Sequence, residues 1–122
     1  MEKTINIIIW GKKFTLPIEY DCYEGESITD KQVEAVDSFI MHPDWIEKSK
    51  NKVEAYCKDE VMRDNKNDIF SYVDPRYLFV KRNEQEPSVA IMLNYYYDPE
   101  HGLAVVFKLN GEVMVGSQDI IL

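Results

Sequence analysis

Two segments at the start of the chain alternate apolar and polar residues in the manner of strands. The segments Thr4–Trp10 and Phe14–Tyr20 are rich in β-branched and aromatic residues, and Gly11-Lys12-Lys13 separates them. This pattern predicts an N-terminal β-hairpin. Pro17 cannot donate a backbone hydrogen bond, so it favours a sheet edge or a strand end for the second segment.

The middle of the chain has helical periodicity. A first helix is expected after Ser27, Thr29 or Asp30, each of which can cap it, with four apolar residues on one face: Val33, Val36, Phe39 and Ile40. Pro43 suits the first turn of a second helix, which we expect to run to about Arg63. Its apolar stripe comprises Trp45, Ile46, Val53, Tyr56, Cys57 and Val61.

Strand patterns return in the last third of the chain. Four segments, at 77–80, 89–97, 103–109 and 112–115, are separated by polar turns, of which Asn110-Gly111 is a strong hairpin signal. We therefore predict one domain over residues 1–122, of the α+β class. Its antiparallel β-sheet would combine the N-terminal hairpin with a C-terminal four-strand meander, with two helices packed on one face.

Charge narrows the range of partners. The net charge is −8, which argues against nucleic acids and anionic membranes, and no apolar run reaches the length of a membrane span. A cytoplasmic location is the simplest expectation. Seven carboxylates and a single base, Lys31, lie between residues 19 and 37 and carry −6 of the −8. This acidic segment, a candidate binding site for a basic protein, contains Glu19, Asp21, Glu24, Glu26, Asp30, Glu34 and Asp37.

The turn Asp98–Gly102 holds His101, one of two histidines in the chain. Asp98 and Gly102 suit an ordinary tight turn, and consecutive hairpins can bring this turn close to the C-terminal Ser117-Gln118-Asp119. We favour a structural latch formed by five residues, namely Asp98, Glu100, His101, Gln118 and Asp119. The alternative is a small enzyme or metal-binding site using Asp98, Glu100 and His101.

No recognised catalytic set or metal-ligand spacing completes that turn. The acidic segment also departs from the spacing of an EF-hand calcium loop. The sequence therefore predicts no catalytic residue, no metal ligand and no cofactor.

Three blocks in the C-terminal third resemble a group of small, largely uncharacterised bacterial proteins that carry a domain of unknown function. The blocks are residues 72–80, residues 97–107 with the turn Asp98-Pro99-Glu100-His101-Gly102, and Gly116-Ser117-Gln118-Asp119. Relatives of this type look like immunity proteins of bacterial toxin systems. The resemblance thus implies a protein that binds and neutralises a toxin, and it carries over no catalytic residue.

Three hypotheses for function follow. The first is a non-enzymatic, acidic protein-binding module, in particular an immunity-type inhibitor of a basic bacterial toxin, with the acidic segment steering association. The second is the enzyme or metal-binding domain centred on His101. The third is an interaction or scaffold protein that forms a homodimer through an exposed strand or a tyrosine surface.

Overall fold

A computed structural model describes residues 3–22, 25–82 and 87–122. Within them the chain forms one six-stranded sheet, three α-helices and two short 3₁₀ turns. The strands are β1 (Lys3–Ile9), β2 (Lys12–Tyr20), β3 (Val73–Val80), β4 (Ser88–Tyr95), β5 (Leu103–Lys108) and β6 (Val113–Gly116). The helical elements are α1 (Asp30–Met41), α2 (Pro43–Tyr56), α3 (Lys58–Asp64), η1 (Ile69–Ser71) and η2 (Gln118–Ile120).

The sheet is mixed, so the prediction of an antiparallel sheet is wrong. The strands lie in chain order, but β2 and β3 run parallel, with Ile18 beside Leu78 and Tyr20 beside Val80. The other neighbouring strands are antiparallel. The physical reason is that all three helices lie between β2 and β3 in the chain. A helical crossover returns the chain to the same end of the sheet and lets the next strand run in the same direction.

The prediction of two helices is also wrong, because the second predicted helix is broken at Cys57. This residue has φ −95° and ψ 2°, and its side chain is buried. Val53, Cys57 and Val61 keep a spacing of four across the break, so the periodicity cannot reveal it. The helix α3 has no buried residue of its own.

The helix α3 is held to the sheet through its last residue. The Tyr97 hydroxyl donates a hydrogen bond to the Asp64 carboxylate at 2.8 Å, and this bond lowers the pKa of Asp64. The Arg63 guanidinium lies 5.7 Å from the centre of the Tyr97 ring. Polar and cation–π contacts therefore add to the packing of Val61, the partly buried residue of α3 that contacts the core.

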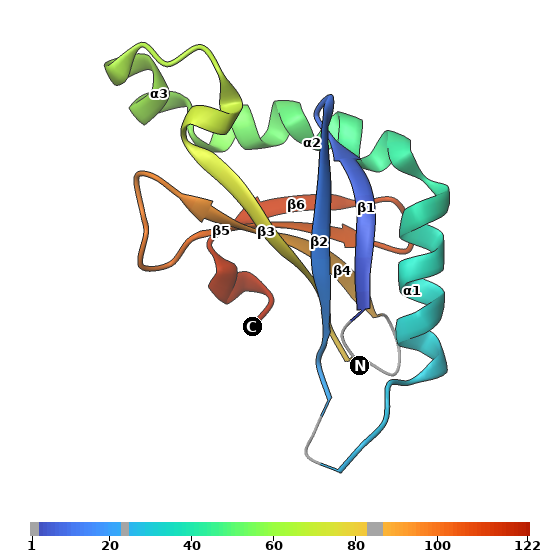
Figure 1. The fold of residues 1–122 in the computed structure, drawn as a ribbon. Coiled ribbons are helices and arrows are strands. Elements are labelled where there is room, and N and C mark those ends of the chain that lie inside the picture. Colours follow the sequence, from blue (N-terminus) through green and yellow to red (C-terminus); the bar gives the residue numbers. More distant parts are fainter. Residues whose placement is uncertain (1–2, 23–24, 83–86) are drawn as a thin grey trace.

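The sheet twists strongly, from upright β1 and β2 to nearly horizontal β5 and β6, with α1 along one side and α2 across the top (Figure 1). Most of the core lies between the sheet and the helices, where the rings of Phe39 and Phe107 stand 5.0 Å apart. A smaller cluster covers the opposite face of the sheet and consists of Ala90, Met92, Ala104, Val106 and Ile121. Ile121 comes from the C-terminal segment, so this segment packs against the sheet face that the helices leave uncovered.

Gln32 joins α1 to the ends of the two parallel strands. Thr29 caps the helix: its Oγ1 accepts from the Gln32 backbone N–H at 3.1 Å, and its own N–H donates to Gln32 Oε1 at 2.9 Å. The Gln32 Nε2 donates to the carbonyl oxygens of Asp21 at 2.9 Å and Val80 at 3.2 Å. The side chain is completely buried, and these bonds satisfy its polar atoms.

In the part of the chain that the structure describes, no helix is both long enough and apolar enough to cross a membrane.

Candidate protein-binding surface

The acidic segment does not form a single patch, because two of its carboxylates pair within the molecule. Asp21 Oδ2 lies 3.7 Å from Lys81 Nζ and also accepts the backbone N–H of Arg82 at 3.3 Å. Glu26 forms an ion pair with the guanidinium of Arg82. These two acids connect the chain before α1 to the end of β3, which explains them as structural residues.

Glu19 is separated from the acids of α1. It stands opposite Phe79 in the register of β2 and β3, and its charge contributes, after burial, to raising the pKa of Tyr77. Tyr77 and Phe79 pack against the cluster on the sheet face away from the helices. Glu24 lies outside the described residues.

The three remaining acids form a ridge along the exposed side of α1. Asp30, Glu34 and Asp37 are spaced by four and three residues, which places them on one face of a helix. Among the described residues, none of the three forms an ion pair. We call Asp30, Glu34 and Asp37 the α1 ridge.

Exposed apolar side chains flank the α1 ridge. Val33 is 42% exposed and Met41 is 77% exposed. Of the four apolar residues predicted to share one face of this helix, Val36 and Phe39 face the core, whereas Val33 and Ile40 remain exposed. Carboxylates beside exposed apolar groups offer a partner both charge complementarity and apolar area to bury.

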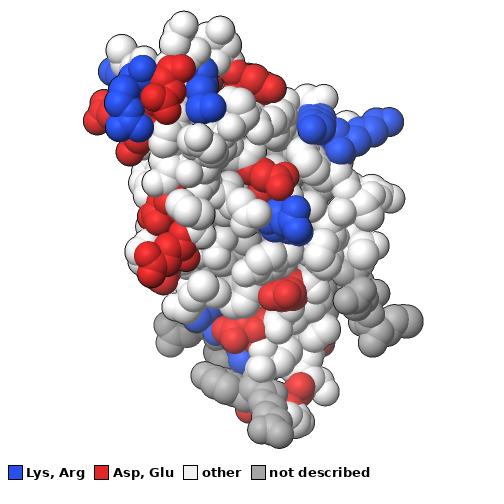
Figure 2. Space-filling model, turned by 60° about the vertical axis from the view of Figure 1, so that its left-hand side comes forward, with Lys and Arg blue, Asp and Glu red and all other residues white. Residues whose placement is uncertain are grey.

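The side of the molecule that carries the C-terminal segment has a different charge pattern. Acidic and basic side chains are scattered over it, and those over α3 at the top of the view are of both signs (Figure 2). The ion pairs Arg63–Asp64 and Arg76–Asp74 are both exposed and contribute little to stability. Acids outnumber bases on the exposed side of α1, where Lys31 is the one base, whereas the charge around α3 is mixed.

An apolar groove separates β1 from the two long helices. It has a volume of about 560 Å³, and its nine lining residues are Thr4, Ile5, Asn6, Ile7, Ile8, Phe39, Ile40, Pro43 and Ile46. None of them is charged. Ile8 and Ile40 are large apolar residues that remain 54% and 53% exposed. We call this space the β1 groove.

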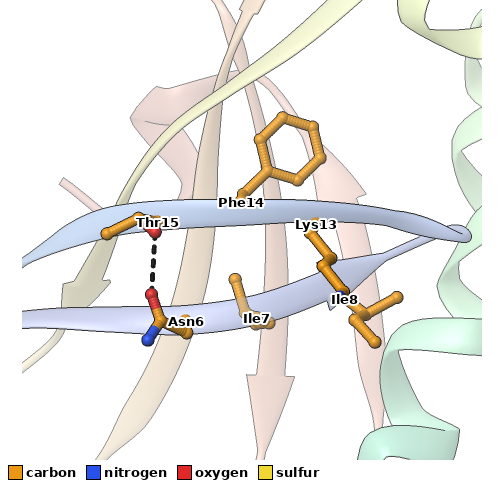
Figure 3. Close-up of a pocket in the computed structure, with 6 residues that line it drawn as sticks. All are labelled: Asn6, Ile7, Ile8, Lys13, Phe14 and Thr15. Atoms are coloured by element: carbon orange, nitrogen blue, oxygen red, sulfur yellow. Dashed lines mark hydrogen bonds between the residues drawn. The ribbon is translucent and has the colours of Figure 1, made fainter.

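A second hollow, of about 460 Å³, follows the hairpin on the other side of β1 (Figure 3). Asn6 and Thr15 face each other across the two strands and are joined by a hydrogen bond of 2.7 Å, while Ile8 lies beside Lys13. Asn6, Ile7 and Ile8 line both hollows. The outer edge of β1 is therefore accessible from two sides.

Trp10 fixes the hairpin to α2 at one end of the β1 groove. Its Nε1 donates to the carbonyl oxygen of Ile46 and to Ser49 Oγ, both at 3.1 Å, and these groups are buried. Its ring lies 5.8 Å from that of Phe70. These buried hydrogen bonds hold the strand pair against α2 at this end of the groove.

The Asp98–Gly102 turn is closed by its own hydrogen bonds. Asp98 Oδ1 lies 3.0 Å from His101 Nδ1 and also accepts the His101 backbone N–H at 3.3 Å. The bond to Asp98 raises the pKa of His101. The Gln118 backbone N–H donates to the His101 carbonyl oxygen, and the Gln118 Nε2 donates to the carbonyl oxygen of Leu93, both at 3.1 Å.

Glu100 and Asp119 take no part in these bonds and are exposed. Gly102 has a φ of +63°, and a Cβ there would stand 2.6 Å from Gln118 Nε2 and 2.9 Å from the Leu93 carbonyl oxygen. Among the described residues there is no group of three or more potential metal ligands. The geometry of this turn suits a structural role, with Gln118 packed over a glycine.

Sequence reasoning overlooked Gln32, Lys81 and Arg82 as binding partners of the acidic segment. Lys81 and Arg82 lie far from Asp21 and Glu26 in the chain, and only the parallel pairing of β2 with β3 brings them together. The capping-box spacing of Thr29 and Gln32 was a usable signal. No sequence signal marks the β1 groove.

These features define the class of this protein as an α+β domain with an open sheet edge and an acidic helix face. A family model described as a domain of unknown function (DUF6985) matches residues 1–122. The chain belongs to this family. No curated protein and no solved structure matches it significantly.

Proposed function

We propose that this chain is a non-enzymatic protein-binding module and that the α1 ridge binds a basic protein. The observation that carries the proposal is the set of three carboxylates on one helix face that lack ion-pair partners among the described residues. Asp21 and Glu26 stabilise the fold through ion pairs and Asp30 favours the first turn of α1, whereas no ion pair among the described residues involves Glu34 or Asp37. Like charges spaced along a helix are mildly unfavourable for folding. Binding of a partner of opposite charge would explain their presence.

The partner's chemistry follows from the surface. Carboxylates accelerate association with a basic protein and discriminate against acidic ones, while Val33 and Met41 supply apolar area beside them. We further propose an immunity-type inhibitor of a basic bacterial toxin, such as a nuclease. The resemblance of the C-terminal motifs to immunity-type proteins supports this choice, and an acidic helix can imitate the phosphates that a nuclease binds.

The test compares two triple variants with the same change in net charge. The ridge variant is Asp30→Lys, Glu34→Lys and Asp37→Lys, and the control is Glu47→Lys, Glu54→Lys and Asp59→Lys, exposed acids of α2 and α3. Each tagged protein is used to capture partners from lysate of the host, with low-salt and then high-salt washes. We expect a stoichiometric basic protein that wild type and control retain at low salt and that the ridge variant loses.

The captured partner, once purified, allows a kinetic test. The ridge variant should associate at least about tenfold more slowly than the control at low salt, with a much smaller difference at high salt, because ionic screening removes long-range attraction. Equal association rates for ridge variant and control would refute the α1 ridge as the binding surface. If no basic protein is captured in a way that depends on the α1 ridge, the proposal as a whole is refuted.

A further inference from the structure

The two edges of the sheet differ in how they are protected. The strand β6 has four residues, and α2 packs along it. The strand β1 has seven residues, and among the described residues β2 is the only strand that pairs with it. Exposed edge strands usually carry charges, prolines or bulges that prevent pairing with another chain. Apart from Lys3 at its start, β1 carries no charged residue and no proline.

The surroundings of β1 do not block access to this edge. The β1 groove lies on one side and the hairpin hollow on the other, and both are lined by Asn6, Ile7 and Ile8. Ile8 and Ile40 expose apolar surface next to backbone groups of β1 that no strand in the described part of the chain pairs with. A strand added here would form a new ladder and would cover both side chains.

We propose that β1 pairs antiparallel with β1 of a second copy of this chain, about a twofold axis, so that the two sheets become continuous. The β1 segment complements itself. Pairing centred on Asn6 overlaps all seven residues, from Lys3 to Ile9, and places Ile5 of one copy opposite Ile7 of the other. Because directly opposed residues share a face and side chains alternate along a strand, Ile5 and Ile7 of both copies face the two β1 grooves, whereas Ile8 lies opposite Thr4 on the other face of the sheet.

Charge favours a second copy over a strand of the basic partner. The β1 groove is uncharged, so it offers nothing to select a basic strand, whereas the neutral segment Thr4–Ile9 matches it. The two Lys3 residues would lie at opposite ends of the paired strands, about 20 Å apart, which exceeds the Debye length at physiological salt. Among the described residues no carboxylate lines either hollow, so two chains of net charge −8 can meet here without opposing acids.

This inference is independent of the proposed function, and salt distinguishes the two. Added salt screens the repulsion between two acidic chains and should strengthen self-association, whereas it should weaken binding of a basic partner to the α1 ridge. The experiment is sedimentation velocity of the full chain, from low micromolar to millimolar concentration, at low and high salt. We expect a monomer–dimer equilibrium that shifts towards the dimer as salt increases.

Two single variants test the interface. Ile8→Lys and Ile40→Lys place a charge on exposed positions beside the edge, and Met62→Lys makes the same change on α3, where the side chain is 68% exposed. Ile8→Lys and Ile40→Lys should each weaken dimerisation at least about tenfold, since an unpaired charge is costly to desolvate, while Met62→Lys should have no effect. Circular dichroism verifies that all three variants remain folded.

Hydrogen exchange provides a readout that needs no variant. Amide protons on the outer edge of β1 should exchange more slowly as protein concentration rises, while those on the exposed side of α3 should not change. A monomer at all concentrations and both salts would overturn the proposal. So would a dimer that both Ile8→Lys and Ile40→Lys leave intact. A monomer whose captured basic partner is lost in Ile40→Lys would instead assign the groove to a partner strand.

Discussion

The hairpin turn after β1 and the turn before β5 each contain a glycine at positive φ, yet their surroundings are opposite. Gly11 has a φ of +86° and no atom within 4 Å of the position of a Cβ. Gly102, at +63°, would bring a Cβ against Gln118 and the Leu93 carbonyl oxygen. The second turn is enclosed by the chain, and its hydrogen-bonding groups are used internally. The first belongs to a region whose strand edge and neighbouring helix face remain accessible.

This difference indicates where binding is to be expected. In the meander of β3 to β6, polar side chains such as Gln118 close turns and cover backbone groups. Around β1 and α1, apolar residues and carboxylates lie at the surface without such partners. Substitutions in the enclosed region should therefore reduce stability, and substitutions in the accessible region should change association while leaving stability nearly unaltered.

The largest effect is expected at the enclosed turn. Gly102→Ala should lower the free energy of unfolding by about 3–5 kcal/mol, because a left-handed backbone, a steric clash and the loss of the Gln118 hydrogen bond combine. Gly11→Ala is the matched control and should cost only about 1 kcal/mol, since only the backbone is strained. Urea unfolding measures both. Equal losses would show that Gln118 does not restrict the space at Gly102.

A smaller loss of stability is expected on α1, where the enclosed region and the accessible region meet. Gln32→Ala should cost about 2–4 kcal/mol, because it opens a cavity, leaves the carbonyl oxygen of Asp21 without its donor and removes one of the two donors to the carbonyl oxygen of Val80. Glu34→Ala, on the exposed side of the same helix, should change stability by less than about 0.5 kcal/mol. Thermal unfolding of both variants makes the comparison. A stable Gln32→Ala protein would contradict the proposed role of this side chain.

The smallest expected effect is the change of stability with pH. The hydrogen bond to Asp98 raises the pKa of His101 above its ordinary value of 6.5. The corresponding stabilisation is therefore fully present below about pH 6.5 and is lost as the pH rises through the higher, folded-state pKa. Titration of the His101 ring by NMR should give a pKa that falls in Asp98→Asn. If the pKa of His101 is unchanged in Asp98→Asn, Asp98 is not the cause of its raised value.

The sequence predicts some of this molecule well because some signals are local. Runs of β-branched and aromatic residues mark strands, and a polar residue before an apolar periodic run marks a helix start, so the α+β class is predictable. The parallel pairing of β2 and β3 is not local, since it depends on how helices cross the sheet. The break at Cys57 keeps the spacing of its neighbours and leaves no trace in the periodicity.

The candidate surface was predictable only in part, for the same reason. Counting charges located the acidic segment, but counting cannot tell that Asp21 and Glu26 meet Lys81 and Arg82 while the α1 ridge meets no base among the described residues. Ile40 has the spacing of a core residue and yet lies at the surface beside β1. Whether an acid is paired or an apolar residue is buried depends on contacts between segments that are distant in the chain.

The position of Trp10 gives the unlabelled protein an optical reporter. Trp10 and Trp45 are its two tryptophans and both are buried, Trp45 as a residue of α2 and Trp10 through its hydrogen bonds to the same helix. Trp45 stacks on His42 and lies under the β5–β6 turn at Gly111, whereas the Trp10 indole donates to Ile46, which also lines the β1 groove. Binding in the β1 groove should therefore change the fluorescence emission of Trp10 more than that of Trp45. The Trp10→Phe variant is the control. Intrinsic fluorescence can follow assembly without a dye.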